Sequence, residues 1–388
     1  MIQKRKILII YAKYGDGHYQ VARTMQQCLE NTGQFDVKIM DVFAESHPMW
    51  NAISRFAFHK GSVYCPKLYG WVYALTNALK PNGRFNRWLQ LLGMAKMKEI
   101  AAREKPDAVI HTFPFLAMSQ LKPKSGGSFA CLTIVTDYVL HNRWIHPNTD
   151  RYFVASSELK DWLMEKGVSN HRIIVSGIPV RSSFQNTIQT QAVFQKYGLN
   201  SKLPIVLIMA GANGVFADAA TIVEEIMQHE AEVVLVCGKN KSLYHAMSKA
   251  FEQTKHVHIL GFVEQIEELM SISSCLISKA GGITLEEART LQLPVVVYRP
   301  LPGQEKGNAE YWQAKGFLQI VDDRSQLNAA VQAATQWKLK AKNGNAGGYH
   351  DHQSAAIIVQ EVVAVINSRM KKKADTSLQG RQIIDEYS

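Results

Sequence analysis

The chain has 388 residues, of which 46% are hydrophobic, and it carries a formal net charge of +11. This length exceeds that of a typical single domain and leaves ample material for hydrophobic cores, so two domains are expected. No apolar run approaches the roughly 20 residues that a bilayer-spanning helix needs, which argues against an integral membrane protein.

The N-terminal segment and the cysteines favour a reducing compartment. A basic stretch, Lys4 to Lys6, precedes only the short apolar run 7–12, which predicts a first core strand and not a signal peptide. The cysteines are odd in number and form no Cys-x-x-Cys pair: Cys28, Cys65, Cys131, Cys237 and Cys275. This pattern predicts neither a disulfide framework nor a zinc site and favours the cytoplasm.

The first half of the chain alternates strand and helix patterns. Strands are predicted at 6–11, 37–40, 108–111, 130–135, 152–155 and 173–175. Apolar strands separated by helical stretches are typical of a parallel, doubly wound sheet. We therefore expect a first α/β domain over 1–182, followed by a linker over 183–203.

The second half repeats the alternation. Strands are predicted at 205–210, 232–237, 256–260, 275–278, 295–298 and 317–321. The pattern predicts a second α/β domain over 204–353, a helix over 354–370 that could cross back to the first domain, and a polar tail over 371–388. Two such domains form a cleft, in which ligands bind beyond the carboxyl ends of the strands.

An insertion over 43–98 interrupts the alternation and is both basic and aromatic. Between positions 46 and 105 there are ten Lys or Arg residues against two acidic ones. Apolar residues fall on one face of each of two predicted helices: Leu68, Trp71, Val72, Leu75 and Leu79 on the first, and Phe85, Trp88, Leu89 and Leu92 on the second.

Such helices either pack on the first domain or lie at a membrane surface, with basic side chains near anionic lipid. The charge excess favours the membrane, and the residues expected to contact the membrane or a lipid acceptor are Trp71, Arg84, Phe85, Arg87 and Trp88. No nucleic-acid-binding motif accompanies the charge, so no nucleic-acid partner is expected.

A glycine-rich turn over 278–288 is the clearest candidate ligand site. Gly281 and Gly282 follow a predicted strand, and Thr284 stands at the start of a helix whose free N–H groups and dipole favour an anion. Glu286 or Glu287 could then accept hydrogen bonds from ribose hydroxyls. An ordinary strand–Gly–Gly–helix turn has the same pattern, so this segment alone leaves both interpretations open.

Four further loops strengthen the ligand interpretation. Small or polar residues follow the predicted strands at 209–214, 236–240, 261–264 and 302–308. Because the carboxyl ends of parallel strands meet at one edge of a sheet, backbone amides of the first three loops could converge on a diphosphate and a base. The fourth loop supplies amide and carboxylate groups suited to sugar hydroxyls.

The candidate catalytic residues lie in the first half. His18 follows a Gly-x-Gly turn at the carboxyl end of the first strand, where an imidazole could accept a proton from a hydroxyl. Asp137 directly follows another strand and could act as base, orient His18 or bind an acceptor hydroxyl. A structural histidine and a helix cap are the alternatives. His141 and His146 are not spaced i,i+4, and no metal site is expected there.

Several motifs together resemble glycosyltransferase family 28, and within it the diacylglycerol glycosyltransferases. They are Gly15-Asp16-Gly17-His18, Thr136-Asp137, Met209-Ala210-Gly211-Ala212-Asn213-Gly214, Cys237-Gly238-Lys239-Asn240, Gly281-Gly282-Ile283-Thr284-Leu285-Glu286-Glu287-Ala288 and Pro302-Gly303-Gln304-Glu305. The resemblance runs in order from about residue 5 to residue 365. It implies a GT-B fold, with two Rossmann-like domains, a UDP-hexose donor in the second domain and a lipid acceptor in the first.

The resemblance also implies an activity. Glucose would pass with inversion from UDP-glucose to the hydroxyl of 1,2-diacylglycerol, and again to the product to give diglucosyldiacylglycerol, for membrane glycolipid and lipoteichoic acid anchor synthesis. A UDP-galactose-dependent monogalactosyldiacylglycerol synthase and a non-catalytic UDP-sugar sensor docked on the membrane are the alternatives. The expected partners are a UDP-sugar, diacylglycerol and anionic lipids, at the cytoplasmic face of the cell membrane.

Site residues can be assigned by motif. The resemblance implies that His18 is the base, Glu287 holds the ribose and the backbone of Val263 holds the uracil. The phosphates would be held by Gly281, Gly282 and Thr284, the sugar by Gln304, Glu305 and Asn308, and the donor further by Gly211, Asn213, Gly238 and Lys239. Asp16 departs from the family pattern, in which glycine or asparagine is common, and places a carboxylate near His18.

No Asp-x-Asp pair occurs in the chain, so the carboxylates that would chelate a metal–diphosphate are absent from the sequence. We therefore expect no metal and no cofactor. A helix N-terminus, helped by Lys239 or Lys279, would stabilise the leaving diphosphate instead.

Overall fold

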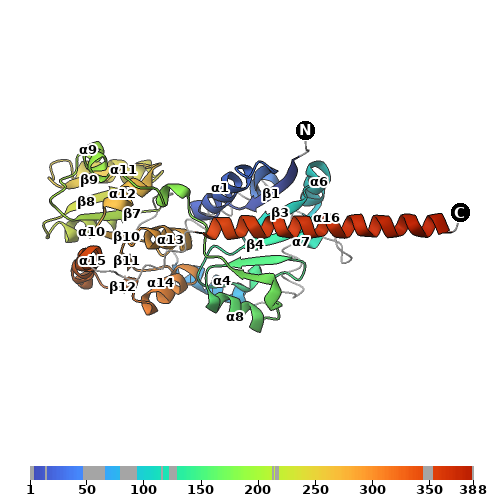
Figure 1. Ribbon diagram of the computed structural model, residues 1–388. Coiled ribbons are helices and arrows are strands. Elements are labelled where there is room, and N and C mark those ends of the chain that lie inside the picture. Colours follow the sequence, from blue (N-terminus) through green and yellow to red (C-terminus); the bar gives the residue numbers. More distant parts are fainter. Residues whose placement is uncertain are drawn as a thin grey trace.

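The computed structural model describes residues 4–13, 15–46, 66–78, 94–114, 117–121, 129–211, 214, 218–343 and 353–386. They form two lobes, each built on a six-stranded parallel sheet covered by helices (Figure 1). All twelve predicted strands are present, and no predicted end differs from the observed one by more than two residues.

The first sheet has the strand order β2-β1-β3-β4-β5-β6. Its strands are β1 (Arg5–Tyr11), β2 (Phe35–Asp41), β3 (Ala108–His111), β4 (Ala130–Ile134), β5 (Arg151–Val154) and β6 (Ile173–Val175). The helices of this lobe are α1 (Asp16–Glu30), α2 (Val42–Ser46), α4 (Pro66–Ala78), α6 (Met94–Glu104), α7 (Ala117–Leu121) and α8 (Ser157–Glu165), with 3₁₀ turns η1 (Asn142–Trp144), η2 (Asn170–Arg172) and η3 (Ser182–Phe184). The core strands β3 and β4 are buried throughout, as expected for a sheet with helices on both faces.

The second sheet has the order β12-β11-β10-β7-β8-β9. Its strands are β7 (Ile205–Met209), β8 (Glu232–Val236), β9 (Val257–Leu260), β10 (Cys275–Ser278), β11 (Val295–Tyr298) and β12 (Leu318–Val321). Its helices are α9 (Thr190–Tyr197), α10 (Ala219–Ile226), α11 (Lys241–Ala250), α12 (Ile266–Ile272), α13 (Gly282–Thr290), α14 (Gln304–Ala314) and α15 (Leu327–Asn343), with the 3₁₀ turn η4 (Arg324–Gln326). The chain reaches the first lobe directly after β7, β10 and β11: Met209 and Gly17 line one pocket, and methyl groups at Gly282 and Gly303 would lie against Thr136 and Tyr73.

The segment predicted as a linker, 183–203, contains a helix. Helix α9 packs against α12, where Lys196 Nζ lies 2.5 Å from Glu268 Oε2. Val193 and Leu199 are buried in the core that runs between the two lobes. The second lobe therefore begins before the predicted boundary at position 204.

The last helix, α16 (Ser354–Glu386), lies against the first lobe, although it follows the second in sequence (Figure 1). It contacts α1 and β4, and Arg369 Nη1 pairs with Asp150 Oδ2 at 3.1 Å. Ile358, Val362 and Ile366 are buried against the first lobe, at the helical spacing of an amphipathic face. The helix is longer than the predicted range of 354–370 and extends past the lobe, through most of the predicted tail.

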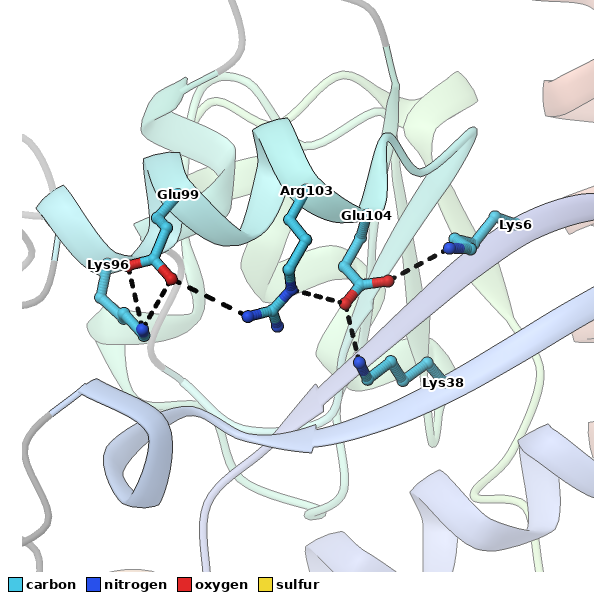
Figure 2. Close-up of polar contacts among 6 residues, drawn as sticks. All are labelled: Lys6, Lys38, Lys96, Glu99, Arg103 and Glu104. Carbon is cyan, nitrogen blue, oxygen red and sulfur yellow. Dashed lines mark hydrogen bonds and ion pairs between the residues drawn. The ribbon is translucent and has the colours of Figure 1, made fainter.

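A buried carboxylate joins helix α6 to the first two strands. Figure 2 shows Glu104, at the C-terminal end of α6, between Lys6 of β1 and Lys38 of β2. Arg103 Nε is 3.0 Å from Glu104 Oε1. A carboxylate at a helix C-terminus is opposed by the helix dipole, and these three cations compensate for it. They lower the pKa of Glu104 to about 2, with the Lys38 hydrogen bond as the largest cause.

Candidate active site

The two lobes meet where helix α13 begins. A methyl group added at Gly282, the first residue of α13, would lie 2.2 Å from the carbonyl oxygen of Thr136. A methyl group at Gly307 of α14 would lie 2.8 Å from Val139 Cγ1. The segment 136–139, which follows β4, is thus packed tightly against α13 and α14 of the second lobe. Only glycine permits this close approach at position 282.

His18 lies in the first turn of α1 and faces this junction. Its Nδ1 is 3.0 Å from Thr136 Oγ1, and its ring packs edge-on against Phe113 with centroids 5.0 Å apart. Its backbone carbonyl accepts a hydrogen bond from Thr112 Oγ1 at 3.1 Å. When Nδ1–H donates to Thr136, Nε2 carries no proton and can accept one.

Asp137 is buried beside His18 and is held by the second lobe. Its Oδ1 accepts a hydrogen bond from Asn308 Nδ2 at 3.0 Å, and Gln304 also hydrogen-bonds to its side chain. Burial raises the pKa of Asp137, while His18 and these two hydrogen bonds lower it. Burial lowers the pKa of His18, and the charge of Asp137 raises it. A neutral imidazole able to accept a proton is the state that burial favours.

A pocket at the carboxyl ends of β7 and β8 brings together four of the predicted donor-binding residues: Gly211, Gly238, Val263 and Glu287. It is also lined by Asp16, Gly17 and Gln20 of α1, by Arg181, and by Met209, Val236, Phe262, Glu264, Ile266 and Ile283. The pocket therefore spans both lobes, and its lining combines apolar side chains with the charged groups of Asp16, Arg181, Glu264 and Glu287.

The structure distinguishes the two glutamates of α13. Glu286 accepts hydrogen bonds from Tyr138 Oη of the first lobe and from Arg289 Nε, the latter at 3.0 Å. Glu287 instead lines the pocket, and burial raises its pKa to about 7. Of the two glutamates, only Glu287 lines the pocket.

Arg181 lines the same pocket, although no sequence motif predicts a role for it. It lies in the chain segment between the lobes, and its Nη2 is 3.2 Å from Glu267 Oε2 and 4.0 Å from Glu287 Oε1. Its charge opposes the rise in the pKa of Glu287. The only sequence feature that could have pointed to Arg181 is its place directly after Pro179-Val180, at the end of the first domain.

The N-terminus of α13 lies against the first turn of α1, which carries His18. Gly281 precedes the helix, and no side chain caps it. Ile283 of this turn packs on Gly17, so the N-termini of α1 and α13 face each other. Free N–H groups and dipoles at two helix starts favour a diphosphate between them. Thr284 is half-buried in the first turn of α13, and its Oγ1 would lie 4.0 Å from a methyl group at Gly281.

Glu305 and Lys279 lie next to this turn. The charge of Lys279 lowers the pKa of Glu305, which burial raises more strongly. Glu305 Oε2 is buried and has no hydrogen-bond partner within the described part of the chain. Such an oxygen can accept a hydrogen bond from a bound ligand, for example from a sugar hydroxyl.

Two residues that were predicted to bind the donor sugar nucleotide, Asn308 and Lys239, already interact with other residues of the protein. Asn308 is fully buried, and its amide bonds to the backbone N–H of Tyr138, to Asp137 and to the carbonyl of Ala280. Both of its N–H donors are thereby used, so Asn308 is not placed to bind a sugar. Lys239 Nζ pairs with Asp16 Oδ2 at 3.1 Å across the lobes. Asp16 thus faces Lys239 in addition to lying two residues before His18.

Comparison with known proteins identifies the family. A model of monogalactosyldiacylglycerol (MGDG) synthase matches residues 18–180, and a model of glycosyl transferases group 1 matches residues 189–346. The chain is 36% identical over 367 residues to a processive diacylglycerol beta-glucosyltransferase of Bacillus cytotoxicus, covering 94% of each protein. It is 37% identical to one from Bacillus cereus, covering 88% of each.

The chain belongs to the processive diacylglycerol β-glucosyltransferase family. Solved structures show the fold of this family member. UDP-GlcNAc 2-epimerase from Neisseria meningitidis superposes with a TM-score of 0.62 at 15% identity, covering 92% of this chain and all of that one. MurG of Acinetobacter baumannii superposes with a TM-score of 0.55 at 15% identity, covering 93% and 99%. The predicted GT-B fold is confirmed.

Helix α4 lies in the middle of the insertion over 43–98 in this glucosyltransferase family member. His141 Nε2 is 3.1 Å from Thr76 Oγ1, and Asn77 Oδ1 accepts from the backbone N–H of Asn142 at 2.9 Å. On the other side, a methyl group at Gly303 would lie 2.8 Å from the ring of Tyr73. Helix α4 is therefore fixed against both lobes. His141 and His146 are buried, which lowers the pKa of each to about 4.

The outer face of α4 is apolar and exposed. Leu68, Trp71, Val72 and Leu75 are 59%, 64%, 46% and 50% exposed. Their i, i+3, i+4, i+7 spacing makes one stripe, and this stripe does not pack on the first domain. Helix α4 thus contacts the first domain, as one interpretation predicted, but its apolar stripe is not part of that contact.

Some predicted residues lie outside the described part of the chain: Asn213, Arg84, Phe85, Arg87 and Trp88. Their roles stay predictions. In the described ranges no helix is long and apolar enough to cross a bilayer. Nor do those ranges hold a group of three or more His, Cys, Asp or Glu side chains arranged for a metal ion.

Proposed function

We propose that this protein transfers glucose from UDP-glucose to the hydroxyl of diacylglycerol, with inversion, and then to its own product. The observation that carries the proposal is the relationship over 94% of the chain to processive diacylglycerol β-glucosyltransferases. The geometry supports it, because His18 directly follows Gly17, which lines the pocket and also lies against the start of α13, a helix N-terminus suited to a nucleoside diphosphate.

His18 acts as the base in this proposal. Nε2 takes the proton of the acceptor hydroxyl while the hydroxyl oxygen forms a bond to the anomeric carbon of glucose. The bond from that carbon to the diphosphate oxygen breaks, and UDP leaves with the electron pair. Thr136 holds Nδ1 and thereby fixes the ring.

The leaving diphosphate is stabilised by the N-terminus of α13 and by Lys279, with no metal ion in the step. Lys239 reaches the phosphates once they displace its contact with Asp16. Glu287 accepts hydrogen bonds from the ribose, the backbone of Val263 binds the uracil, and Glu305 Oε2 binds a glucose hydroxyl.

The exposed stripe of α4 docks on the membrane in this proposal. Trp71 and its apolar neighbours enter the headgroup region, and the basic residues of the insertion meet anionic lipid. The enzyme is then peripheral, at the cytoplasmic face. Because α4 also contacts the Gly303 loop, docking places the lipid hydroxyl close to the site.

Product analysis tests the proposal. The purified protein is incubated with vesicles of diacylglycerol and phosphatidylglycerol, with UDP-glucose or UDP-galactose, in the presence and absence of EDTA. Glucosyl- and diglucosyldiacylglycerol should form with UDP-glucose, and EDTA should leave the rate unchanged. Galactolipid alone would reassign the donor, and UDP-glucose binding without any lipid product would favour a sensor. A rate abolished by EDTA would overturn the metal-free step.

A further inference from the structure

The contacts of Asn308 give it a part in the reaction that its buried position alone does not suggest. Asn308 belongs to α14 of the second lobe, but two of its three hydrogen bonds go to the first lobe. Oδ1 accepts from the N–H of Tyr138 at 2.9 Å, and Nδ2 donates to Asp137 Oδ1 at 3.0 Å. The third, from Nδ2 to the carbonyl of Ala280 at 3.1 Å, fixes the amide within its own lobe.

The surroundings make these contacts depend on the closed arrangement of the lobes. Gly282 and Gly307 border the segment 136–139 so closely that a methyl group at either position would clash with it. This segment carries both Thr136, which holds His18, and Asp137. If the lobes separate, the segment loses Asn308 and both glycine contacts together.

We propose that Asn308 is a positioning residue, which fixes the Asp137 carboxylate beside His18 only when the donor lobe is closed on the acceptor lobe. The inference rests on the proposed glucosyl transfer. Asn308 touches neither substrate nor the reacting atoms. It acts through Asp137 by donating one N–H to the carboxylate and by holding the following peptide, which sets the side-chain direction. The base is thereby completed after the donor lobe has closed.

Charge supports the same assignment. The titratable groups facing Asp137 are His18 from α1 and Glu305 from α14, and Lys279 in turn faces Glu305. Asp137 also lies beside the first residue of α13, where the helix dipole favours a carboxylate. The Asn308 hydrogen bond lowers the pKa of Asp137, so loss of this bond should raise the proton affinity of the His18–Asp137 pair.

Three variants of the full-length enzyme test the inference on vesicles with UDP-glucose. Asn308→Ala should lower kcat on the order of 100-fold, as expected for a displaced catalytic group, with the KM for UDP-glucose changed far less. The acid limb of its kcat profile should move to higher pH by roughly one unit. Asn308→Asp keeps the side-chain shape and the acceptor for Tyr138, but it places a second carboxylate beside Asp137, so its acid limb should move further.

Tyr138→Phe is the matched control. It removes another hydrogen bond between the lobes, to Glu286, but leaves Asp137 untouched, and its ring keeps its packing against Tyr311 and Trp312. Its acid limb should stay at the wild-type pH. If Tyr138→Phe and Asn308→Ala shift the profile equally, or if neither Asn308 variant shifts it, Asn308 is only a clamp between lobes. A wild-type enzyme without transfer activity would instead refute the proposed function.

Should Asn308→Ala fail to fold, as judged by thermal unfolding, the near-isosteric Asn308→Asp decides the question alone. A normal acid limb in a folded Asn308→Asp enzyme would overturn the inference.

Discussion

The two walls of the cleft are built in different ways. The nucleotide wall, where we propose that the donor binds, consists mainly of loops at the ends of neighbouring strands in one lobe, such as those carrying Gly211, Gly238 and Val263. The catalytic wall, where we propose that the base acts, consists of contacts between distant segments: His18 with Thr136, and Asp137 with Asn308. Most residues of the first wall belong to one lobe, although Asp16, Gly17 and Gln20 of α1 also line the pocket, whereas the second wall is complete only when the lobes meet. Binding and chemistry should therefore be separable by mutation.

The largest effect is expected on the catalytic wall. His18→Ala removes the base, and kcat should fall about 10²- to 10⁴-fold, because general-base catalysis contributes factors of that size. UDP binding, measured by isothermal titration calorimetry, should change little, since the pocket lining does not include His18. A comparable loss of UDP affinity would show that the two walls are not independent.

The adjacent glutamates of α13 sharpen the comparison on the nucleotide wall. Glu287→Gln should raise the KM for UDP-glucose roughly tenfold, the loss of about one charge-assisted hydrogen bond, with little change in kcat. Glu286→Gln should leave the KM near that of the wild type and lower the thermal stability, because Glu286 binds Arg289 and Tyr138. An equal rise in KM for both variants would refute the assignment.

The same residue predicts a pH dependence of donor binding. The pKa of Glu287 is about 7 in the free enzyme because of burial. Ribose hydroxyls donate to the ionised carboxylate, so UDP affinity should increase as the pH rises from 6 to 8, and this increase should be absent in Glu287→Gln. Calorimetry across that range, in buffers of matched ionic strength, makes the measurement.

A smaller effect is expected outside both walls, on helix α4. Trp71→Glu places a charge in the exposed stripe and should weaken binding to phosphatidylglycerol vesicles about tenfold, or roughly 1.4 kcal/mol. Sedimentation with vesicles measures it. Calorimetry with UDP should give the wild-type affinity, and unchanged vesicle binding would remove the stripe from the membrane contact.

The smallest effect on activity is expected far from the cleft, at Glu104. Glu104→Gln should lower the free energy of unfolding by roughly 1–3 kcal/mol and leave kcat unchanged, because the carboxylate holds three cations that are themselves partly exposed. The folded pKa of about 2 lies below the ordinary 4.5, so this stabilisation is full above pH 4.5 and is lost as the pH falls toward 2. The free energies of unfolding of the wild type and of Glu104→Gln, measured with denaturant, should therefore become equal as the pH is lowered toward 2.

The sheets were predictable from the sequence because a strand buried on both faces is a continuous apolar run, as in Ile205–Met209. Helix α9 was not predicted within the linker, because eight residues with few apolar positions give a weak helical period. The bounds of α16 were also hard to place, since its projecting end is as polar as a loop.

The nucleotide wall was easier to predict than the catalytic one for a physical reason. Strand ends are local features, so Gly211, Gly238 and Val263 could be grouped from topology alone. The choice between Glu286 and Glu287 depends on Tyr138, which lies 148 residues away in sequence. Asn308 is bonded to Asp137, which lies 171 residues away in sequence. No local pattern encodes such pairings.

Helix α16 gives the two lobes a second covalent connection. The chain leaves the first lobe near Gly177 and is back on it at Ser354, the first residue of α16, and a methyl group at Gly177 would lie only 2.5 Å from Ser354 Oγ. The point where the chain leaves the first lobe and the point where it returns are therefore adjacent. We expect rotation about this shared point to be the easiest relative motion of the lobes, so that each closure brings the same two surfaces together.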